Sequence, residues 1–343
     1  MTTTLGGGLV RFRFDPDDAE VTAVDLDCDP AVPGPRSLHR DGDGWHLYLP
    51  RPPVQRVEYR FAVSRGAETE TVLDPLNPAR VATAFGDRSV LELPGYAPPW
   101  WLDAPVVEGR LTDLSLVGET ADEVPVTVWA PADLPEDEPA PLLLVHDGPE
   151  YDSLASLTTY SAALVASGDL PPHRVALAHP VLRDAWYSGS PQYLRTVAEA
   201  GLDRIDARFA RRSPVVVAGA SLGGLTALLL GVLASPRTGG VLAQSGSFFQ
   251  VRHDDSESGY RWFGRISRTV QSLLDMRHVE HPLVVGMTCG TLEENLANNR
   301  DMASALTRAG HEVRLREVPD LHNYTAWRDA LDPTLTEVLQ RVW

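Results

Sequence analysis

The segment Val215–Leu228 constrains the fold more than any other part of the sequence. Its first residues, Val215 to Val217, are β-branched and apolar, which is typical of a central strand in a parallel sheet. Residues 225–233 are rich in leucine and alanine, which favour a helix. The motif G-x-S-x-G joins the two, with Gly219, Ser221 and Gly223. The segment therefore predicts a buried strand, a sharp turn and a helix, in that order.

The turn at Ser221 has the composition of a nucleophile elbow. A side chain at either flanking glycine would collide with neighbouring parts of the chain, because the strand turns directly into the helix. The turn would lift Oγ of Ser221 clear of the sheet, beside the N–H groups of the helix N-terminus. We expect Ser221 to be a nucleophile and the Leu222 N–H to bind a developing oxyanion. The alternative is an ordinary glycine-containing turn with an incidental serine.

Composition and charge argue against several classes of protein. The chain has 343 residues, enough for two domains, and its net charge of −17 argues against binding to nucleic acid or anionic membranes. Its two cysteines, Cys28 and Cys289, favour a reducing compartment. The N-terminus lacks the basic and apolar regions of a signal peptide, and no stretch approaches the length of a membrane span. We expect a cytoplasmic protein; its oligomeric state is not predicted.

The chain divides into two regions of different texture. Alternation of apolar and polar residues predicts strands at 9–14, 21–26, 45–49 and 57–63. The intervening segments are rich in the turn formers proline, glycine and aspartate. We therefore expect residues 1–100 to form an immunoglobulin-like β-sandwich. A proline- and tryptophan-rich junction at 95–102 separates it from a second domain, residues 101–343.

The second region alternates strands and helices. We expect strands at 111–117, 124–130, 141–146, 174–179, 214–218, 240–244, 283–289 and 312–318. Helices are expected near 153–167, 191–209, 297–309 and 324–341. Interleaved strands and helices predict an α/β fold with a doubly wound, mostly parallel sheet. Catalytic groups in such sheets lie at the carboxyl ends of the strands.

A base and an acid follow Ser221 in the chain order that this architecture uses. His322 comes directly after a predicted strand and just before the last helix, which makes it the candidate base. Glu293 and Glu294 follow the strand at 283–289. A carboxylate there would bind Nδ1 of His322 and stabilise its imidazolium, and we favour Glu293 for this role. The alternative is that both glutamates cap the following helix.

A second oxyanion donor is expected after the strand at 141–146. The candidate is a backbone N–H between Gly148 and Tyr151, excluding Pro149, which has none. His146 precedes the nucleophile in the chain, so we expect it to pack within the sheet. His278 and His281 form an H-x-x-H pair, but no further ligand lies nearby in the sequence. We expect neither a metal nor an organic cofactor.

The sequence resembles the enterochelin (ferric enterobactin) esterase family over most of its length. The resemblance rests on the order and spacing of residues 73–78, 85–91, 146–148, 183–188, 219–224, 244–247 and 322–327. It implies a two-domain α/β-hydrolase that opens ester bonds of catecholate siderophores and releases iron. It also implies Ser221 as nucleophile, His322 as base and Arg183 as a substrate contact. Some members of this family work with a Ser–His dyad, which leaves the role of Glu293 open.

Aromatic and cationic residues would suit a ferric catecholate substrate. Trp186, Tyr187, Phe248 and Phe249 could stack on aromatic acyl groups, with Tyr151 nearby, or could instead line the core. Arg252, Arg261 and Arg265 could supply positive charge. Because acidic residues interrupt the same segment, the alternative is a solvated lid of mixed charge.

The sequence predicts a serine esterase that acts through an acyl-enzyme on a small-molecule ester. The first alternative is a feruloyl- or acetyl-type esterase on carbohydrate or small aryl esters. The second is a non-catalytic binding protein on a hydrolase scaffold.

Overall fold

The computed structural model describes residues 2–5, 8–16, 20–42, 44–105, 107–118 and 123–343. The chain divides into two compact units. The β-sandwich unit consists of Met1–Ala97 together with two short segments of the C-terminal half, Gly290–Glu294 and Pro319–Asn323. The α/β unit consists of Pro98–Cys289, Asn295–Val318 and Tyr324–Trp343.

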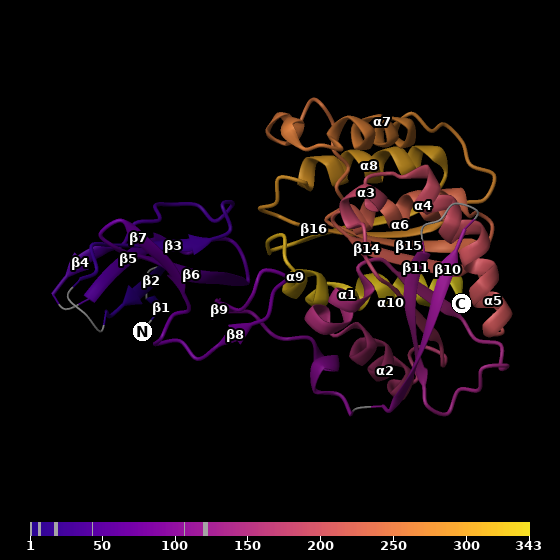
Figure 1. Cartoon of the computed structure of the whole chain (residues 1–343), viewed down its shortest axis with the longest axis horizontal. Coiled ribbons are helices and arrows are strands. Elements are labelled where there is room, and N and C mark those ends of the chain that lie inside the picture. Colours follow the sequence, from indigo (N-terminus) through magenta and orange to yellow (C-terminus); the bar gives the residue numbers. More distant parts are fainter. Residues whose placement is uncertain (1, 6–7, 17–19, 43, 106, 119–122) are drawn as a thin grey trace. The chain divides into compact units, whose positions relative to one another are not determined.

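The α/β unit is built on a sheet with the strand order β10-β11-β13-β12-β14-β15-β16-β17 (Figure 1). Its strands are β10 (Gly109–Val117), β11 (Glu123–Pro131), β12 (Leu142–Val145), β13 (Arg174–Ala178), β14 (Val215–Ala220), β15 (Thr238–Gln244), β16 (Val284–Gly290) and β17 (Glu312–Val318). The pair β10–β11 is antiparallel, as is β11–β13. The pairs β13–β12, β12–β14, β14–β15 and β15–β16 are parallel. The predicted mostly parallel sheet is confirmed.

Helices cover both faces of this sheet. They are η1 (Trp100–Asp103), α1 (Gly148–Ala155), α2 (Leu157–Ser167), α3 (Arg183–Tyr187), α4 (Pro191–Thr196), η2 (Val197–Gly201), α5 (Leu202–Arg208), α6 (Leu222–Leu233), η3 (Asp255–Gly259), α7 (Phe263–Leu274), α8 (Leu296–Ala309), α9 (Tyr324–Asp329) and α10 (Leu331–Val342). Figure 1 shows α6, α7 and α8 on one side of the sheet and α1, α2 and α10 on the other. No helix in the described part of the chain is both long and apolar enough to cross a membrane.

The position of β14 in the middle of the sheet explains why its sequence is apolar throughout. Val215 and Val217 belong to the core shared with α6 and α8, whereas Val216 and Ala218 belong to the core shared with α2 and α10. Both faces of the strand are therefore buried, since side chains alternate along a strand and helices cover each face. This burial places the end of β14, and Ser221 after it, on a rigid element.

The β-sandwich unit contains two antiparallel sheets. Their orders are β1-β2-β5-β4 and β3-β6-β9-β8, with β7 paired to β6. The strands are β1 (Thr3–Leu5), β2 (Leu9–Phe14), β3 (Ala23–Cys28), β4 (His39–Asp41), β5 (Gly44–Pro50), β6 (Arg56–Arg65), β7 (Glu68–Val72), β8 (Arg80–Val81) and β9 (Arg88–Glu92). Rings from the two sheets meet in the core, where Phe12 packs edge-on against Tyr59 at 5.1 Å. The predicted N-terminal sandwich is confirmed.

Some element boundaries differ from the prediction. The helix expected at 153–167 is divided at Ser156, which has a left-handed φ of 54°. The helix expected at 191–209 contains a π-helical turn, η2, and the helix expected at 324–341 ends at α9 and resumes as α10. The helix α7 was not predicted, although Ile266, Val270 and Leu273 form its buried stripe.

Candidate active site

Ser221 lies between β14 and α6 in a strained backbone conformation. Its φ is 56° and its ψ is −123°, a combination that non-glycine residues rarely adopt. The flanking glycine is required: a Cβ on Gly219 would lie 2.3 Å from the carbonyl oxygen of Gly223. A Cβ on Gly223 would lie 3.2 Å from Oδ2 of Asp147. The strand, turn and helix therefore have the geometry expected of a nucleophile elbow.

The end of β15 and the loop that follows it form hydrogen bonds with Ser221. The Ser221 N–H donates to the Gln244 carbonyl at 2.9 Å, and the Ser247 N–H donates to the Ser221 carbonyl at 3.0 Å. The hydroxyl oxygens of Ser221 and Ser247 lie 3.3 Å apart. Sequence reasoning assigned no role to Ser247, although it lies in one of the segments that carry the family resemblance. Its proximity to Oγ of Ser221 appears only in three dimensions, because 26 positions separate the two.

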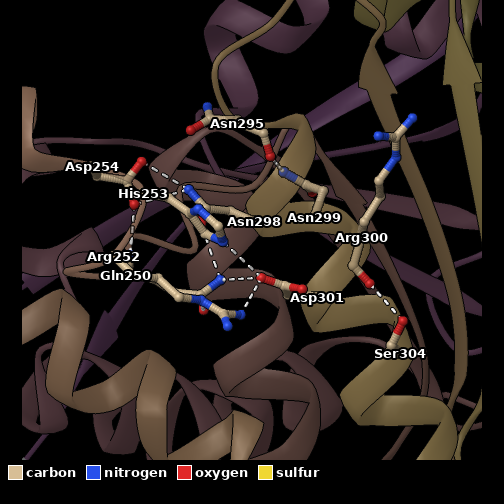
Figure 2. A network of polar contacts seen from close by, with 10 residues as sticks. All are labelled: Gln250, Arg252, His253, Asp254, Asn295, Asn298, Asn299, Arg300, Asp301 and Ser304. Carbon is tan, nitrogen blue, oxygen red and sulfur yellow. Dashed lines mark hydrogen bonds and ion pairs between the residues drawn. The ribbon is translucent and has the colours of Figure 1, made fainter.

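A polar network fixes this loop to α8 (Figure 2). Asn299 accepts from the Gly246 N–H at 3.2 Å and donates to the Gly246 carbonyl at 3.1 Å. Farther along the loop, Asn298 donates to both carboxylate oxygens of Asp254, at 2.9 and 3.0 Å. These three side chains are buried, so the network is shielded from water and holds the loop in one arrangement.

The same network uses one of the arginines expected to attract an anionic substrate. Arg252 pairs with Asp301, which also lies 3.1 Å from Nε2 of His253. Arg265 donates to the backbone carbonyls of Ala185 and Ser188. In the structure, Arg252 and Arg265 bind other parts of the protein. The sequence had suggested that they supply positive charge to an anionic substrate.

Asp147 organises the turn between β12 and α1. It has a left-handed φ of 53°, and its N–H donates to the Tyr187 hydroxyl at 3.1 Å. Arg183 binds its carboxylate in a bidentate manner, with Nε to Oδ1 at 2.7 Å and Nη2 to Oδ2 at 2.8 Å. Burial disfavours the charged form of Arg183, but the Asp147 carboxylate outweighs this effect and raises the Arg183 pKa. A cation held in this way neutralises Asp147 beside the start of α6.

The two expected oxyanion donors are the first residues of neighbouring helices. Leu222 begins α6 after β14, and Gly148 begins α1 after β12, the strand paired to β14. The first N–H groups of a helix have no acceptor within that helix. A Cβ on Gly148 would lie 2.3 Å from Cα of Leu177, so only glycine lets α1 begin this close to β13. Both helix N-termini add positive electrostatic potential.

His322 and Glu293 form the other half of the expected chemistry. Nδ1 of His322 lies 2.7 Å from Oε2 of Glu293, and Oε1 of Glu293 accepts the Gly290 N–H at 2.7 Å. The carboxylate is only an acceptor when ionised, so Nδ1 carries the hydrogen and Nε2 is left to accept a proton. The Glu293 side chain is 2% exposed, whereas that of His322 is 34% exposed. Glu293 makes this contact, while Glu294 is exposed.

The aromatic residues expected to stack on a substrate are buried. Exposed fractions are 4% for Trp186, 0% for Tyr187 and Phe248, and 1% for Tyr151. Tyr151 donates its hydroxyl to Oε1 of Gln244 at 2.5 Å, and Tyr187 supports Asp147. The structure places these rings in the core and not on a surface that a substrate could reach. Arg183 keeps a 36% exposed side chain, so a substrate contact by Arg183 stays a prediction.

His146 packs in the interior, as the sequence predicted. It is fully buried, and its Nδ1 lies 3.1 Å from the Tyr193 hydroxyl. Burial lowers the His146 pKa to about 3, which keeps the ring neutral. Among the described residues, no group of three or more His, Cys, Asp or Glu side chains is arranged to hold a metal ion.

Comparison with known proteins shows to which family the chain belongs. The model of the Esterase family matches residues 118–338. The chain belongs to the Esterase family. The match begins within the described α/β unit and includes Ser221, Glu293 and His322. An esterase activity therefore agrees with the elbow and the His–Glu pair.

Individual members and solved structures extend the comparison. The iron(III) enterobactin esterase of Dickeya dadantii is 30% identical over 246 residues, which are 65% of this chain and 53% of that protein. The chain thus matches about half the length of this curated relative. The enterobactin esterase of Shigella flexneri, solved in the presence of enterobactin, is 21% identical with a TM-score of 0.80, covering 99% of this chain and 96% of that chain. The ferric enterobactin esterase of Salmonella typhimurium is 20% identical with a TM-score of 0.80 over the same shares.

A ferulic acid esterase shares less of this fold. It is 19% identical with a TM-score of 0.56, covering 68% of this chain and 99% of that chain. The resemblance to enterochelin esterases that the sequence indicated is confirmed, and so is the predicted fold class.

Proposed function

We propose that this esterase is a serine hydrolase that opens the ester bonds of a catecholate siderophore of the enterobactin type. Ser221 is the nucleophile, His322 its base and Glu293 the carboxylate that orients the base. The observation that carries the proposal is the pairing of a strained elbow at Ser221 with a His322–Glu293 contact of 2.7 Å. A binding protein has no need of either feature.

The reaction proceeds in two stages. Oγ of Ser221 attacks the ester carbonyl carbon as Nε2 of His322 takes the hydroxyl proton. The carbonyl oxygen becomes an oxyanion, which the N–H groups of Leu222 and Gly148 stabilise. The C–O bond then breaks, and the departing alkoxide takes the proton from His322 to leave an ester on Ser221. Water attacks this ester with His322 again as base, which releases the carboxylic acid and restores Ser221.

Glu293 acts through His322 and touches no substrate in this mechanism. Its carboxylate holds the hydrogen on Nδ1 and stabilises the imidazolium that forms in each stage. The second oxygen of Glu293 is fixed by the Gly290 N–H, so the carboxylate cannot rotate freely away from the ring.

The substrate class is supported by the relatives and not by the surface charge. Each of the two named structures that match 99% of this chain is of an enterobactin esterase. A ferric catecholate is anionic while the chain carries a net charge of −17, so the substrate must meet local cations. Arg183 is the candidate, because it begins α3, is partly exposed and binds Asp147 in the turn before α1. Opening the ligand would weaken its hold on iron and release the metal inside the cell.

The test compares labelling with turnover. A fluorophosphonate probe should label Ser221 in the wild type, identified by peptide mapping, and should not label Ser221→Ala. Enterobactin, a feruloyl ester, an acetylated glycan and an aryl ester should then be compared by kcat/KM. We expect enterobactin to be preferred by at least about 100-fold. Preference for the feruloyl or glycan ester would reject the siderophore, and inertness to both probe and esters would favour a binding protein.

A further inference from the structure

A buried ion pair joins the β-sandwich to the segment that carries His322. Nη2 of Arg56, the first residue of β6, donates to Oδ2 of Asp320. Both side chains are only 2% exposed. The two residues are 264 positions apart in the sequence but belong to the same compact unit. A charge pair removed from water in this way costs desolvation energy, so its presence does not by itself indicate a net gain in stability.

Two further contacts fix the same segment to the sandwich, and a third orders the segment itself. The Gln55 N–H donates to the Pro319 carbonyl at 2.8 Å. Gln55 immediately precedes Arg56 in the chain, and Pro319 immediately precedes Asp320. Leu321 is 2% exposed and belongs to the hydrophobic core of the sandwich. Oδ1 of Asp320 accepts the Leu321 N–H at 3.0 Å. The chain is therefore held at 319, 320 and 321, immediately before His322.

The segment that carries Glu293 packs against the same place. A Cβ on Gly290 would lie 2.4 Å from the carbonyl oxygen of Asp320, so the two backbones touch. Leu292 packs against the sandwich core, and Glu293 reaches His322 from there. Acid and base are thus both attached to elements of the β-sandwich unit, although each follows a strand of the α/β sheet.

We propose that Arg56 is a positioning residue for the esterase reaction, acting through Asp320 to orient His322. This inference rests on the proposed function, since it assigns Arg56 a role in the action of the catalytic base. The guanidinium is itself fixed, because it lies over the Tyr96 ring at 4.7 Å. A displacement of about 1 Å at a catalytic group is enough to cost roughly 100-fold in rate. The β-sandwich unit then helps to orient the proposed base.

Stability and positioning can be separated at this pair. Removing one charge leaves its partner buried and uncompensated, which destabilises the fold. Removing both charges avoids that penalty but does not restore the directional contact. Arg56→Met and Asp320→Asn should each lower Tm, and the double variant should recover most of it. Asparagine keeps an oxygen that can accept the Leu321 N–H.

The experiment measures Tm, kcat, KM and the rate of fluorophosphonate labelling on the full chain with an aryl ester and enterobactin. We expect Arg56→Met, Asp320→Asn and the double variant to lower kcat and the labelling rate at least tenfold, with KM within about threefold of wild type. Arg56→Lys, which keeps the charge, should recover part of kcat. Arg88→Met is the matched control, because Arg88 pairs with Asp27 within the same sandwich at 3.2 Å. It should retain wild-type kcat.

The outcomes separate this inference from the function on which it rests. Recovery of kcat together with Tm in the double variant would overturn the positioning role and leave a purely structural pair. A kcat within twofold of wild type in a folded Arg56→Met variant would do the same. If Arg56→Met fails to fold, the double variant and Arg56→Lys decide the question by the same criteria. A wild-type protein that is neither labelled nor active would reject the proposed function, and the inference with it.

Discussion

At the scale of single residues, the proposed chemistry depends on where His322 keeps its hydrogen. The contact of 2.7 Å to Glu293 places the hydrogen on Nδ1 and leaves Nε2 basic. The sequence narrowed the acid to two adjacent glutamates and favoured Glu293. It could not decide between them, because the direction of each side chain depends on how residues 290–294 pack in the β-sandwich unit.

Glu293→Gln should lower kcat by roughly 10³- to 10⁴-fold, because an amide can bind Nδ1 in the wrong tautomer. The variant should fold, since glutamine has nearly the same shape. The measurement is kcat on an aryl ester, with Glu294→Gln as the control at wild-type activity. A Glu293→Gln enzyme within tenfold of wild type would indicate a Ser221–His322 dyad.

Asp147 and Arg183 show what residue patterns leave out. The sequence drew attention to Arg183 as a substrate contact but gave Asp147 no role. The bidentate pair depends on the left-handed backbone at Asp147 and on a partner 36 positions later. The buried aromatic side chains show the same limit. Composition alone does not distinguish rings that stack on a substrate from rings that pack in the core.

Arg183→Met should destabilise the protein by about 1–3 kcal/mol, because the nearly buried Asp147 loses its charged partner. The exposed edge of Arg183 limits the loss, since solvent screens part of the interaction. Chemical denaturation measures the change. Asp147→Asn in the same chain should restore most of the stability, and an unchanged free energy of unfolding in the single variant would contradict this account.

At the scale of elements, sequence periodicity succeeded where burial is regular. The strand β14 and the helix α6 were expected within a few residues, because both faces of the strand are apolar. Periodicity did not reveal the breaks at Ser156 and Ala330, which depend on local backbone geometry. The spacing of Ile266, Val270 and Leu273 did contain a signal for α7, but charged neighbours masked it.

The elbow should tolerate no side chain at Gly219. Gly219→Ala would place Cβ 2.3 Å from a backbone oxygen, so β14 or α6 must move. We expect a loss of at least about 2–3 kcal/mol in the free energy of unfolding, together with lost activity. Gly264→Ala is the control, since its nearest heavy atom outside the local backbone is 3.8 Å away, on the Arg268 side chain. That substitution should be neutral or stabilise α7 by up to about 1 kcal/mol; equal effects at both glycines would contradict the steric argument.

At the scale of the whole molecule, buried histidines link folding to pH. Burial lowers the pKa of His146 to about 3 and that of His173 to about 4. Both groups take up protons more readily in the unfolded chain, where the ordinary pKa is about 6.5. Their contribution to stability is therefore complete above pH 6.5 and is lost progressively as the pH falls toward the folded-state values.

Lowering the pH from 7 to 5 should cost about 2 kcal/mol of stability for each of these two histidines. Urea denaturation at both pH values measures the change. His146→Gln cannot take up the proton, so it should lose about half of this pH dependence. A free energy of unfolding that is the same at pH 7 and pH 5 in the wild type would show that these rings are not held neutral.

The mostly parallel sheet and the N-terminal antiparallel β region followed from sequence, because alternating and interleaved patterns extend over many residues. The attachment of residues 290–294 and 319–323 to the β-sandwich unit did not follow. No local sequence pattern predicts that Arg56 pairs with Asp320, because the two residues are 264 positions apart and come together only in the folded chain.

The most direct test of the central claim is a time course of enterobactin and its ferric complex with wild type and Ser221→Ala, analysed by chromatography. Our account predicts that the linear trimer, dimer and monomer of dihydroxybenzoylserine appear in turn with the wild type alone. It predicts no product above the background of spontaneous hydrolysis with Ser221→Ala. Products formed equally by both proteins, or no conversion by a wild type that the fluorophosphonate labels, would contradict it.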